Sequence, residues 1–235
     1  MLFILTGDVQ SGKTRWLERL VAELAADGVE SRGVLAPGVW RPRADGDDGG
    51  LRPPGSGEGA YEKLGIDNVL LPDGERISFA RRGDLARADG TFDEESQAAK
   101  AELAWHIDDE AIARVNTHFD ELAVRASVAV PTDAKSHSGR SAEGAESKDP
   151  SRAPGLLIVD ELGRLEIWRG GGLTSAMALL AQGPTAAFPH ALAVVRDYLL
   201  DDAEILLAEA WPDHCRISPD DTGRAVILSA CEFGA

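Results

Sequence analysis

The sequence predicts an α/β fold with three layers, in which helices cover both faces of a mostly parallel central sheet. Continuously apolar segments with the composition of buried strands occur at residues 2–6, 155–159 and 191–195. Each is followed by apolar residues at helical spacing, at residues 13–27, 173–181 and 199–209. The chain has 235 residues, of which 43% are hydrophobic, and this is enough for one such domain.

The segment after the first helix is expected to add strands to this sheet. One strand is predicted at residues 33–40. The sequence Pro72-Asp73-Gly74-Glu75 is typical of a turn, and the segments 66–71 and 76–81 on either side of it are predicted to form a β-hairpin.

The remaining elements complete the alternation of strands and helices. A short strand is predicted at residues 105–107, and it leads into a helix at residues 108–128. A short strand at residues 214–217 and a last element that begins at Asp221 close the chain.

Two segments have compositions that oppose regular structure. Residues 41–59 are rich in Gly, Pro and Asp, and they are predicted to form a mobile loop. Residues 131–154 contain no aromatic residue, Leu, Ile, Val or Met, so they are predicted to be a disordered insertion. The sequence therefore predicts a single domain over residues 1–235, with one loop and one insertion inside it.

Composition and the lengths of the apolar runs indicate which kinds of partner the protein binds and where in the cell it is located. The net charge of −16 disfavours binding to nucleic acid, because an acidic field repels phosphate backbones. Cys215 and Cys231 match no metal or redox spacing. No apolar run is long enough to span a membrane, and the apolar segment at residues 2–5 is too short for a signal peptide. We expect a cytoplasmic protein without a membrane partner, and a monomer rather than an oligomer.

The segment between the first strand and the first helix matches a phosphate-binding loop. Gly7 and Gly12, followed by Lys13 and Thr14, fit the pattern G-x-x-x-x-G-K-[ST] at every defined position. Glycine lets the backbone N–H groups converge on a polyphosphate, and the helix N-terminus adds partial positive charge. Lys13 is expected to reach the β- and γ-phosphates, and the Thr14 hydroxyl to bind Mg²⁺. The predicted nucleotide-binding residues are Gly7, Asp8, Val9, Gln10, Ser11, Gly12, Lys13, Thr14 and Arg15.

An apolar strand that ends in Asp160 is typical of a Walker B segment. Asp160 is expected at the carboxyl edge of the sheet, where it would bind the same Mg²⁺. In an extended segment the side chain of Glu161 points to the other side of the strand tip, where it would deprotonate an attacking water as the catalytic base. The alternative for both residues is a solvated strand end.

Two arginines are candidates for stabilising charge on the transferred phosphoryl group. Arg196 directly follows the predicted strand at residues 191–195, so it should reach the same edge of the sheet. A surface ion pair with Asp197 or Asp201 is the alternative for Arg196. Arg164 is a weaker candidate of the same kind.

The Walker B segment also resembles that of a known family. The segment from Ile158 to Ile167 reads IVDELGRLEI, and together with the loop it resembles the small P-loop nucleoside-triphosphatases related to human cancer-related NTPase and its thermophilic homologues. Their Walker B region typically reads Asp-Glu-Ile-Gly-Lys-Met-Glu-Leu, so Arg164 stands in place of a lysine. The chain also departs from the family at Val9-Gln10, where Pro-Gly is usual, and at Arg15, where Thr is usual.

The resemblance implies a P-loop NTPase fold of the RecA/ATPase-like type, with an additional strand between the P-loop strand and the Walker B strand. It implies Mg²⁺-dependent hydrolysis of ATP and other nucleoside triphosphates with little base preference. By position, Lys13 and Thr14 would bind the phosphates and Mg²⁺. Asp160 would bind Mg²⁺, and Glu161 would be the catalytic base.

The favoured function is hydrolysis of a nucleoside triphosphate, in which Lys13, Glu161 and Arg196 are the predicted catalytic residues. One alternative is a kinase that phosphorylates a nucleoside, nucleotide or other small molecule, with the acceptor held by the segment from Gly33 to Arg81, which is rich in Arg near Arg81 and Arg82. A second alternative is a nucleotide-dependent switch or scaffold. The sequence has no Asn-Lys-x-Asp motif, so guanine selectivity of that type is not expected. For Trp16, Trp105 and Trp168 we expect packing in the core or on the surface, with stacking on the nucleobase as the alternative.

Overall fold

The computed structural model describes residues 1–8, 11–42, 61–128 and 153–232. The predicted mobile loop at 41–59 lies outside these residues except for its first two positions. The predicted disordered insertion at 131–154 lies outside them except for its last two positions.

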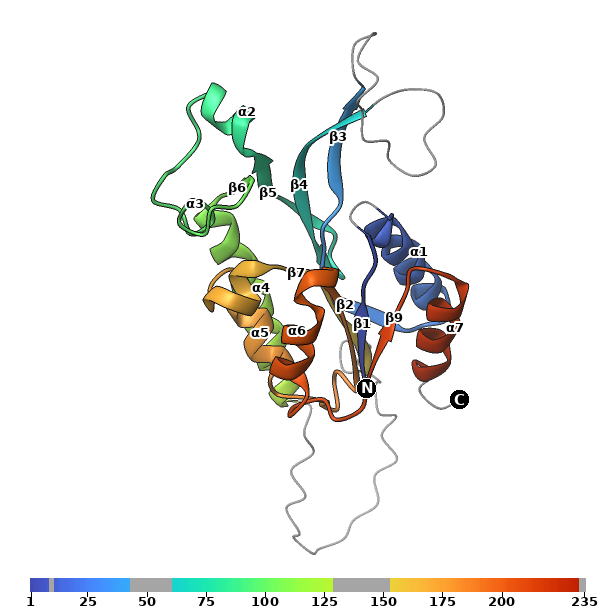
Figure 1. Cartoon of the computed structure of the whole chain (residues 1–235). Helices are drawn as coiled ribbons and strands as arrows, with labels where there is room; N and C mark the ends of the chain where they lie inside the picture. Colours follow the sequence, from blue (N-terminus) through green and yellow to red (C-terminus); the bar gives the residue numbers. More distant parts are fainter. Residues whose placement is uncertain (9–10, 43–60, 129–152, 233–235) are drawn as a thin grey trace, which may run out of the picture.

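A large mixed sheet forms the centre of the molecule (Figure 1). Its strands follow the order β6-β5-β4-β2-β7-β8-β1-β9, with β3 paired to β4. One side of this order is entirely parallel. It consists of β2 (Glu30–Leu35), β7 (Gly155–Leu162), β8 (His190–Val195), β1 (Leu2–Leu5) and β9 (His214–Ile217). We call these five strands the parallel half. Within it β8 lies between β1 and β7, as the resemblance implies for the strands of the P-loop and of Walker B.

The other side of the sheet is antiparallel. It consists of β3 (Gly38–Pro42), β4 (Tyr61–Leu71), β5 (Glu75–Arg82) and β6 (Trp105–Ile107). We call these four strands the antiparallel extension. The predicted hairpin is confirmed as β4 and β5, and the predicted strand at residues 105–107 is confirmed as β6.

The single strand predicted at residues 33–40 is wrong, because the chain forms two strands there. β2 ends at Leu35 and β3 begins at Gly38, with Ala36 and Pro37 between them. Pro37 has no N–H group, and the N–H of Ala36 bonds to the Asp160 side chain, so neither residue donates to a strand. The break lets β2 pair with β7 while β3 pairs only with β4.

Helices cover both faces of the sheet and complete the predicted three layers (Figure 1). α1 (Lys13–Ala26) and α7 (Asp221–Ala230) cover one face, and the other face is covered by α4 (Asp109–Val128), α5 (Thr174–Leu180) and α6 (Leu200–Leu207). Alternate residues of β1 supply the two cores, with Leu2 and Ile4 on the α4 side and Phe3 and Leu5 on the α1 side. None of the described helices is both long and apolar enough to cross a membrane.

Two short helices between β5 and β6 are not predicted from the sequence. They are α2 (Gly83–Ala88) and α3 (Gln97–Lys100), and each is at most six residues long. A helix this short has no apolar period to detect, so only its capping residues signal it. Ser96 is such a residue, since its side chain accepts a hydrogen bond from the N–H of Ala99.

Parallel strands place their carboxyl ends at one edge of the sheet, and this edge positions the candidate site. Leu5 pairs with Val194 and Val159 pairs with Ala193, so β1, β7 and β8 end at neighbouring positions. The loop that begins at Thr6, the carboxylates at Asp160 and Glu161, and Arg196 therefore leave the sheet at the same edge, as predicted.

Candidate active site

The loop between β1 and α1 is shaped by two glycines and by Lys13. Gly7 has a φ of 141° and Gly12 a φ of 88°, which are backbone conformations that residues with a Cβ rarely adopt. The ammonium of Lys13 donates hydrogen bonds to the carbonyl oxygens of Gly7, at 2.6 Å, and Asp8, at 2.8 Å. The described part of the loop therefore turns around the Lys13 ammonium. Val9 and Gln10, which the sequence also assigns to nucleotide binding, lie outside the described residues.

The N-terminus of α1 is open to an anion. Gly12 is the N-cap, no side chain caps the helix, and its first turn has no acidic residue. The first N–H groups of a helix have no partner within the helix, so those of α1 are left for an external acceptor. Ser11 and Arg15, beside this helix start, are exposed, as is Asp8.

Asp197 supports the start of the loop, and the sequence analysis missed this role. Its Oδ1 accepts hydrogen bonds from the Thr6 hydroxyl, at 2.6 Å, and from the N–H of Gly7, at 3.0 Å. These bonds, the one from Thr6 foremost, hold the pKa of Asp197 below its ordinary value. The available signal was its position two residues after β8, which neighbours β1 in the sheet.

Asp160 and Thr14 form the candidate Mg²⁺ site. Asp160 is only 3% exposed, and burial raises its pKa to about 6 despite hydrogen bonds from the Ala36 N–H and the Thr14 hydroxyl. A hydroxyl and a carboxylate are hard oxygen ligands, which fit Mg²⁺. Among the described residues there is no group of three or more His, Cys, Asp or Glu that could hold a metal. Mg²⁺ at this site would therefore take its other ligands from phosphate oxygens and water.

Glu161 is paired with Arg196 across the ends of β7 and β8. Arg196 Nε donates to Glu161 Oε1, and both side chains are about one third exposed. Arg196 therefore does not form the alternative pair with Asp201, which bonds to Arg216 instead. Glu161 and Asp160 line the same pocket. The peptide bond between Asp160 and Glu161 is cis.

The segment after Glu161 is held by a second buried acid. Glu166 accepts hydrogen bonds from the N–H groups of Gly163, at 2.8 Å, and Leu173, at 2.9 Å. Burial raises the pKa of Glu166 in this position. Arg164 lines the same pocket and donates to the carbonyl of Glu102 at 3.2 Å. Glu166 thus closes the turn that follows the Walker B residues.

A pocket of about 240 Å³ begins at the Mg²⁺ side of the loop and continues toward the antiparallel extension. Thr14, Asp160, Glu161 and Arg196 line one part of it. Its other part is lined by residues that the sequence analysis did not single out, among them Trp105 and, within the segment suggested for an acceptor, Lys63 and Asn68. Trp105 lies at the pocket, whereas Trp16 is in the core as expected. No local pattern marks Lys63 and Asn68, because the pairing of β4 brings them to the pocket.

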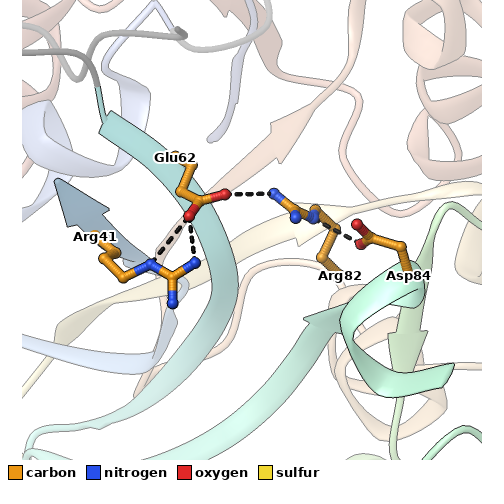
Figure 2. Close-up of polar contacts among 4 residues, drawn as sticks. All are labelled: Arg41, Glu62, Arg82 and Asp84. Carbon is orange, nitrogen blue, oxygen red and sulfur yellow. Dashed lines mark hydrogen bonds and ion pairs between the residues drawn. The ribbon is translucent and has the colours of Figure 1, made fainter. Parts of the chain in front are cut away.

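Arg81 and Arg82, which the sequence suggested for an acceptor site, are bound elsewhere. Arg82 donates to Glu62 at 3.1 Å and to Asp84 at 2.6 Å, and Arg41 approaches the same Glu62 from β3 (Figure 2). Arg81 forms an ion pair with Asp89. Neither arginine lines the described pocket.

Comparisons with known proteins bear on the fold that carries this site. No family model and no curated protein matches the sequence. The structure is similar to that of THEP1 from the hyperthermophile Aquifex aeolicus, with a TM-score of 0.50 and 16% sequence identity, over 98% of this chain and 96% of that chain. An identity this low bears on the fold alone. The chain thus has the P-loop NTPase fold, with a mostly parallel central sheet flanked by helices.

Proposed function

We propose that the protein is a Mg²⁺-dependent nucleoside-triphosphatase, which converts a nucleoside triphosphate and water into a nucleoside diphosphate and phosphate. The observation that carries the proposal is the arrangement of Asp160 and Glu161. Both carboxylates line one pocket together with Thr14, the last residue of the P-loop pattern. A nucleotide-binding loop alone needs no second carboxylate at this place, whereas hydrolysis needs a group that accepts a proton from water.

Each residue has a distinct part in this reaction. Lys13 and the open N-terminus of α1 bind the phosphates. Mg²⁺ bound through Thr14 and Asp160 would neutralise charge on the phosphate oxygens. Glu161 takes a proton from the attacking water, whose oxygen forms a bond to the γ-phosphorus while the bond to the bridging oxygen breaks. Arg196, which holds Glu161, supplies a cation beside the transferred group.

Broad base specificity follows from where the candidate contacts lie. The loop and the α1 N-terminus bind phosphate oxygens, and the triphosphate group is the same in ATP, GTP, CTP and UTP. We therefore propose ATP or another nucleoside triphosphate as the substrate, with little discrimination among bases.

Phosphate release by the wild type and by Glu161→Gln tests the proposal. With ATP and Mg²⁺ the wild type should turn over, and Glu161→Gln should lose on the order of 10²–10⁴-fold in kcat while it still binds ATP. Chelation of Mg²⁺ should abolish the wild-type rate. Lys13→Ala is the control for phosphate binding, and the exposed Arg19→Ala on α1 is the control for substitution itself. Equal rates in the wild type and Glu161→Gln would reject Glu161 as the base.

A second candidate, transfer of the phosphoryl group to an organic acceptor, is favoured by one observation. The pocket extends from Glu161 well beyond the space that a single attacking water needs. Hydrolysis and transfer use the same loop, metal and carboxylates, and they differ in what occupies this pocket.

A further inference from the structure

We propose that the pocket between Glu161 and the antiparallel extension binds a nucleoside monophosphate as a phosphoryl acceptor. The inference rests on the proposed function, because the donor of the phosphoryl group is the triphosphate held by the P-loop. It adds a second substrate, and it assigns Asn68, Lys63 and Trp105 to that substrate.

The position of the pocket favours an acceptor over another part of the donor. Of the described residues of the P-loop pattern, Thr14 alone lines it, so the pocket starts at the Mg²⁺ and γ-phosphate side of the loop. From there it leads away from the loop toward β4, β5 and β6. A molecule in this pocket would therefore face the γ-phosphorus from the side opposite the nucleotide, where an acceptor oxygen must approach.

The size of the pocket exceeds what hydrolysis requires. A water molecule takes a share of about 30 Å³ in the liquid, so a pocket of about 240 Å³ has room for about eight. Hydrolysis needs one attacking water and the waters on Mg²⁺. The excess lies along an apolar wall, which suits the faces of a planar ring. The side chains of this wall include Ile66, Phe79, Leu103, Trp105, Ile107 and Leu173.

Asn68 gives the wall a polar group without a partner. It is 1% exposed and lines the pocket, and its side chain makes no hydrogen bond to any residue that the structure describes. The amide is not one of the fully buried side-chain groups that lack a partner, so it meets the open space of the pocket, where a ligand can bond to it. A carboxamide both donates and accepts hydrogen bonds, as the edge of a nucleobase does.

Lys63 supplies a cation for the phosphate of the acceptor. Its ammonium lies 5.9 Å from the ring centre of Trp40 and 5.4 Å from that of Trp105, and it forms no ion pair within the described residues. Burial lowers the pKa of Lys63, while Glu161 and Asp160 oppose this change. An ammonium set between two indole rings at the rim of a polyphosphate site is well placed for an anionic group. Glu62, the residue before it, is bound to Arg41 and Arg82 (Figure 2).

The transfer step conserves atoms and charge. A phosphate oxygen of the nucleoside monophosphate forms a bond to the γ-phosphorus of the triphosphate. The bond from that phosphorus to its bridging oxygen breaks, and the electron pair leaves with the nucleoside diphosphate. The products are two nucleoside diphosphates, and no oxidant or reductant takes part.

Calorimetry without any triphosphate tests the site separately from the proposed function. The probes are AMP, GMP, CMP and UMP, with adenosine and inorganic phosphate to separate the ring from the anion. At least one monophosphate should bind, and more tightly than either adenosine or phosphate. Asn68→Leu should weaken it about tenfold and Lys63→Met about fivefold. Lys100→Met, an exposed lysine, should leave the affinity unchanged, and Lys13→Ala should leave monophosphate binding intact.

Two results would overturn the site. One is that no monophosphate binds to the wild type. The other is that binding survives both Asn68→Leu and Lys63→Met but is lost in Lys13→Ala, which would place it on the P-loop. Thermal unfolding of each variant shows whether it is folded, and Lys63→Met serves as the second test should Asn68→Leu not fold.

Label from γ-labelled ATP tests the acceptor role. With the bound monophosphate present, label should appear in the corresponding nucleoside diphosphate. Label that appears only in inorganic phosphate would overturn the acceptor role and support hydrolysis. Monophosphate binding without any cleavage of ATP would overturn the proposed function while the assigned site stands.

Discussion

The parallel half of the sheet and the antiparallel extension meet at the candidate site, and they contribute different kinds of group to it. β1, β7 and β8 are buried along almost their whole length, so they reach the site only through the residues at their carboxyl ends. β4, by contrast, is partly exposed along most of its 11 residues, and it reaches the pocket through side chains along the strand, at Lys63 and Asn68. The parallel half thus contributes the groups proposed to bind phosphate and metal, and the extension contributes much of the wall of the pocket.

The two regions also differ in whether a buried or partly buried acidic side chain is paired with an arginine. In the parallel half Asp160 is buried without an ion pair to any described residue, and its pKa is raised. In the extension Glu62 is bound by Arg41 and Arg82, and the bond from Arg41 foremost lowers its pKa (Figure 2). An unpaired buried acid is ready to bind a cation, whereas a paired acid holds strands together. The comparison predicts that substitutions in the parallel half act on phosphate and metal, and those in the extension act on the pocket.

The largest expected effect is that of Lys13→Ala. It removes the cation that the loop surrounds, so ATP hydrolysis should fall on the order of 10²–10³-fold and ATP affinity should fall with it. Phosphate release and calorimetry with ATP measure both, with Arg19→Ala as the control. Retained ATP affinity would break the assignment of phosphate binding to the parallel half.

Gly33→Ala is expected to disturb the pairing of β2 with β7, at the place where the parallel half joins the antiparallel extension. Gly33 pairs with Ile158 of β7 on one side and with Leu71 of β4 on the other, and its φ is 119°. A Cβ there would lie 2.0 Å from the carbonyl oxygen of Ile158, so we expect a loss of about 3 kcal/mol or more in the free energy of unfolding. Denaturant unfolding measures this loss.

Gly28→Ala is the matched control for this prediction. Gly28 also has a positive φ, of 78°, but a Cβ there meets nothing within 4 Å. The control should cost only about 1–2 kcal/mol, from backbone strain. An equal loss in both variants would mean that β2 and β7 can separate at this point at little cost.

The two regions differ as well in how far the sequence predicted them. The loop at Gly7 to Thr14 and the carboxylates at Asp160 and Glu161 could be placed because each motif is contiguous and lies at a strand end. Arg196 could be placed at the same edge for the same reason. Its bond to Glu161 could not be predicted, since it depends on how two side chains meet across 35 positions of sequence.

In the extension, side-chain direction depends on strand pairing. β4 has an irregular register against β5 between Ile66 and Asp67, and such a shift changes which residues share a face. Simple alternation along β4 therefore does not reveal that both Lys63 and Asn68 line the pocket. Trp105 reaches it because β6 pairs with the far end of β5, which is a tertiary contact.

Asp160→Asn should stabilise the metal-free protein above pH 6 and remove its response to Mg²⁺. The pKa of Asp160 is raised from 3.8 to about 6 in the folded state, so the folded state binds more protons than the unfolded state between these values. The contribution of Asp160 to stability is therefore present below pH 4 and lost as the pH rises through 6. At pH 8 with a chelator, Asp160→Asn should be more stable by about 1–3 kcal/mol.

Unfolding of the wild type and this variant from pH 4 to pH 8 measures the difference, which should vanish at pH 4. Mg²⁺ with ATP should stabilise the wild type more than Asp160→Asn. Asp120→Asn, on the exposed side of α4, is the control and should show no such pH dependence. A variant less stable than the wild type at pH 8 would contradict the view that burial of the charge is the dominant effect.

The smallest expected effect is that of Glu62→Gln, which tests whether the extension shapes the pocket. Glu62 joins β3 to the end of β5 through Arg41 and Arg82, while the next residue, Lys63, lines the pocket (Figure 2). Loss of the charge should loosen the three strands and weaken monophosphate binding on the order of twofold, because partly exposed ion pairs contribute little. ATP hydrolysis should stay at the wild-type rate, since Glu62 touches neither the loop nor the Walker B residues. Glu75→Gln, which removes the bond to Arg114 at the opposite end of the hairpin, should leave monophosphate binding and hydrolysis unchanged.

The effect of Glu62→Gln should also depend on pH. Because the pKa of Glu62 is lowered, its ion pairs are present above the ordinary pKa of a glutamate and are lost as the pH falls through the lowered pKa, so the variant and the wild type should converge in acid. If Glu62→Gln slowed hydrolysis as much as it weakened monophosphate binding, the two regions would act as one unit, and the division between a catalytic parallel half and a selective extension would be wrong.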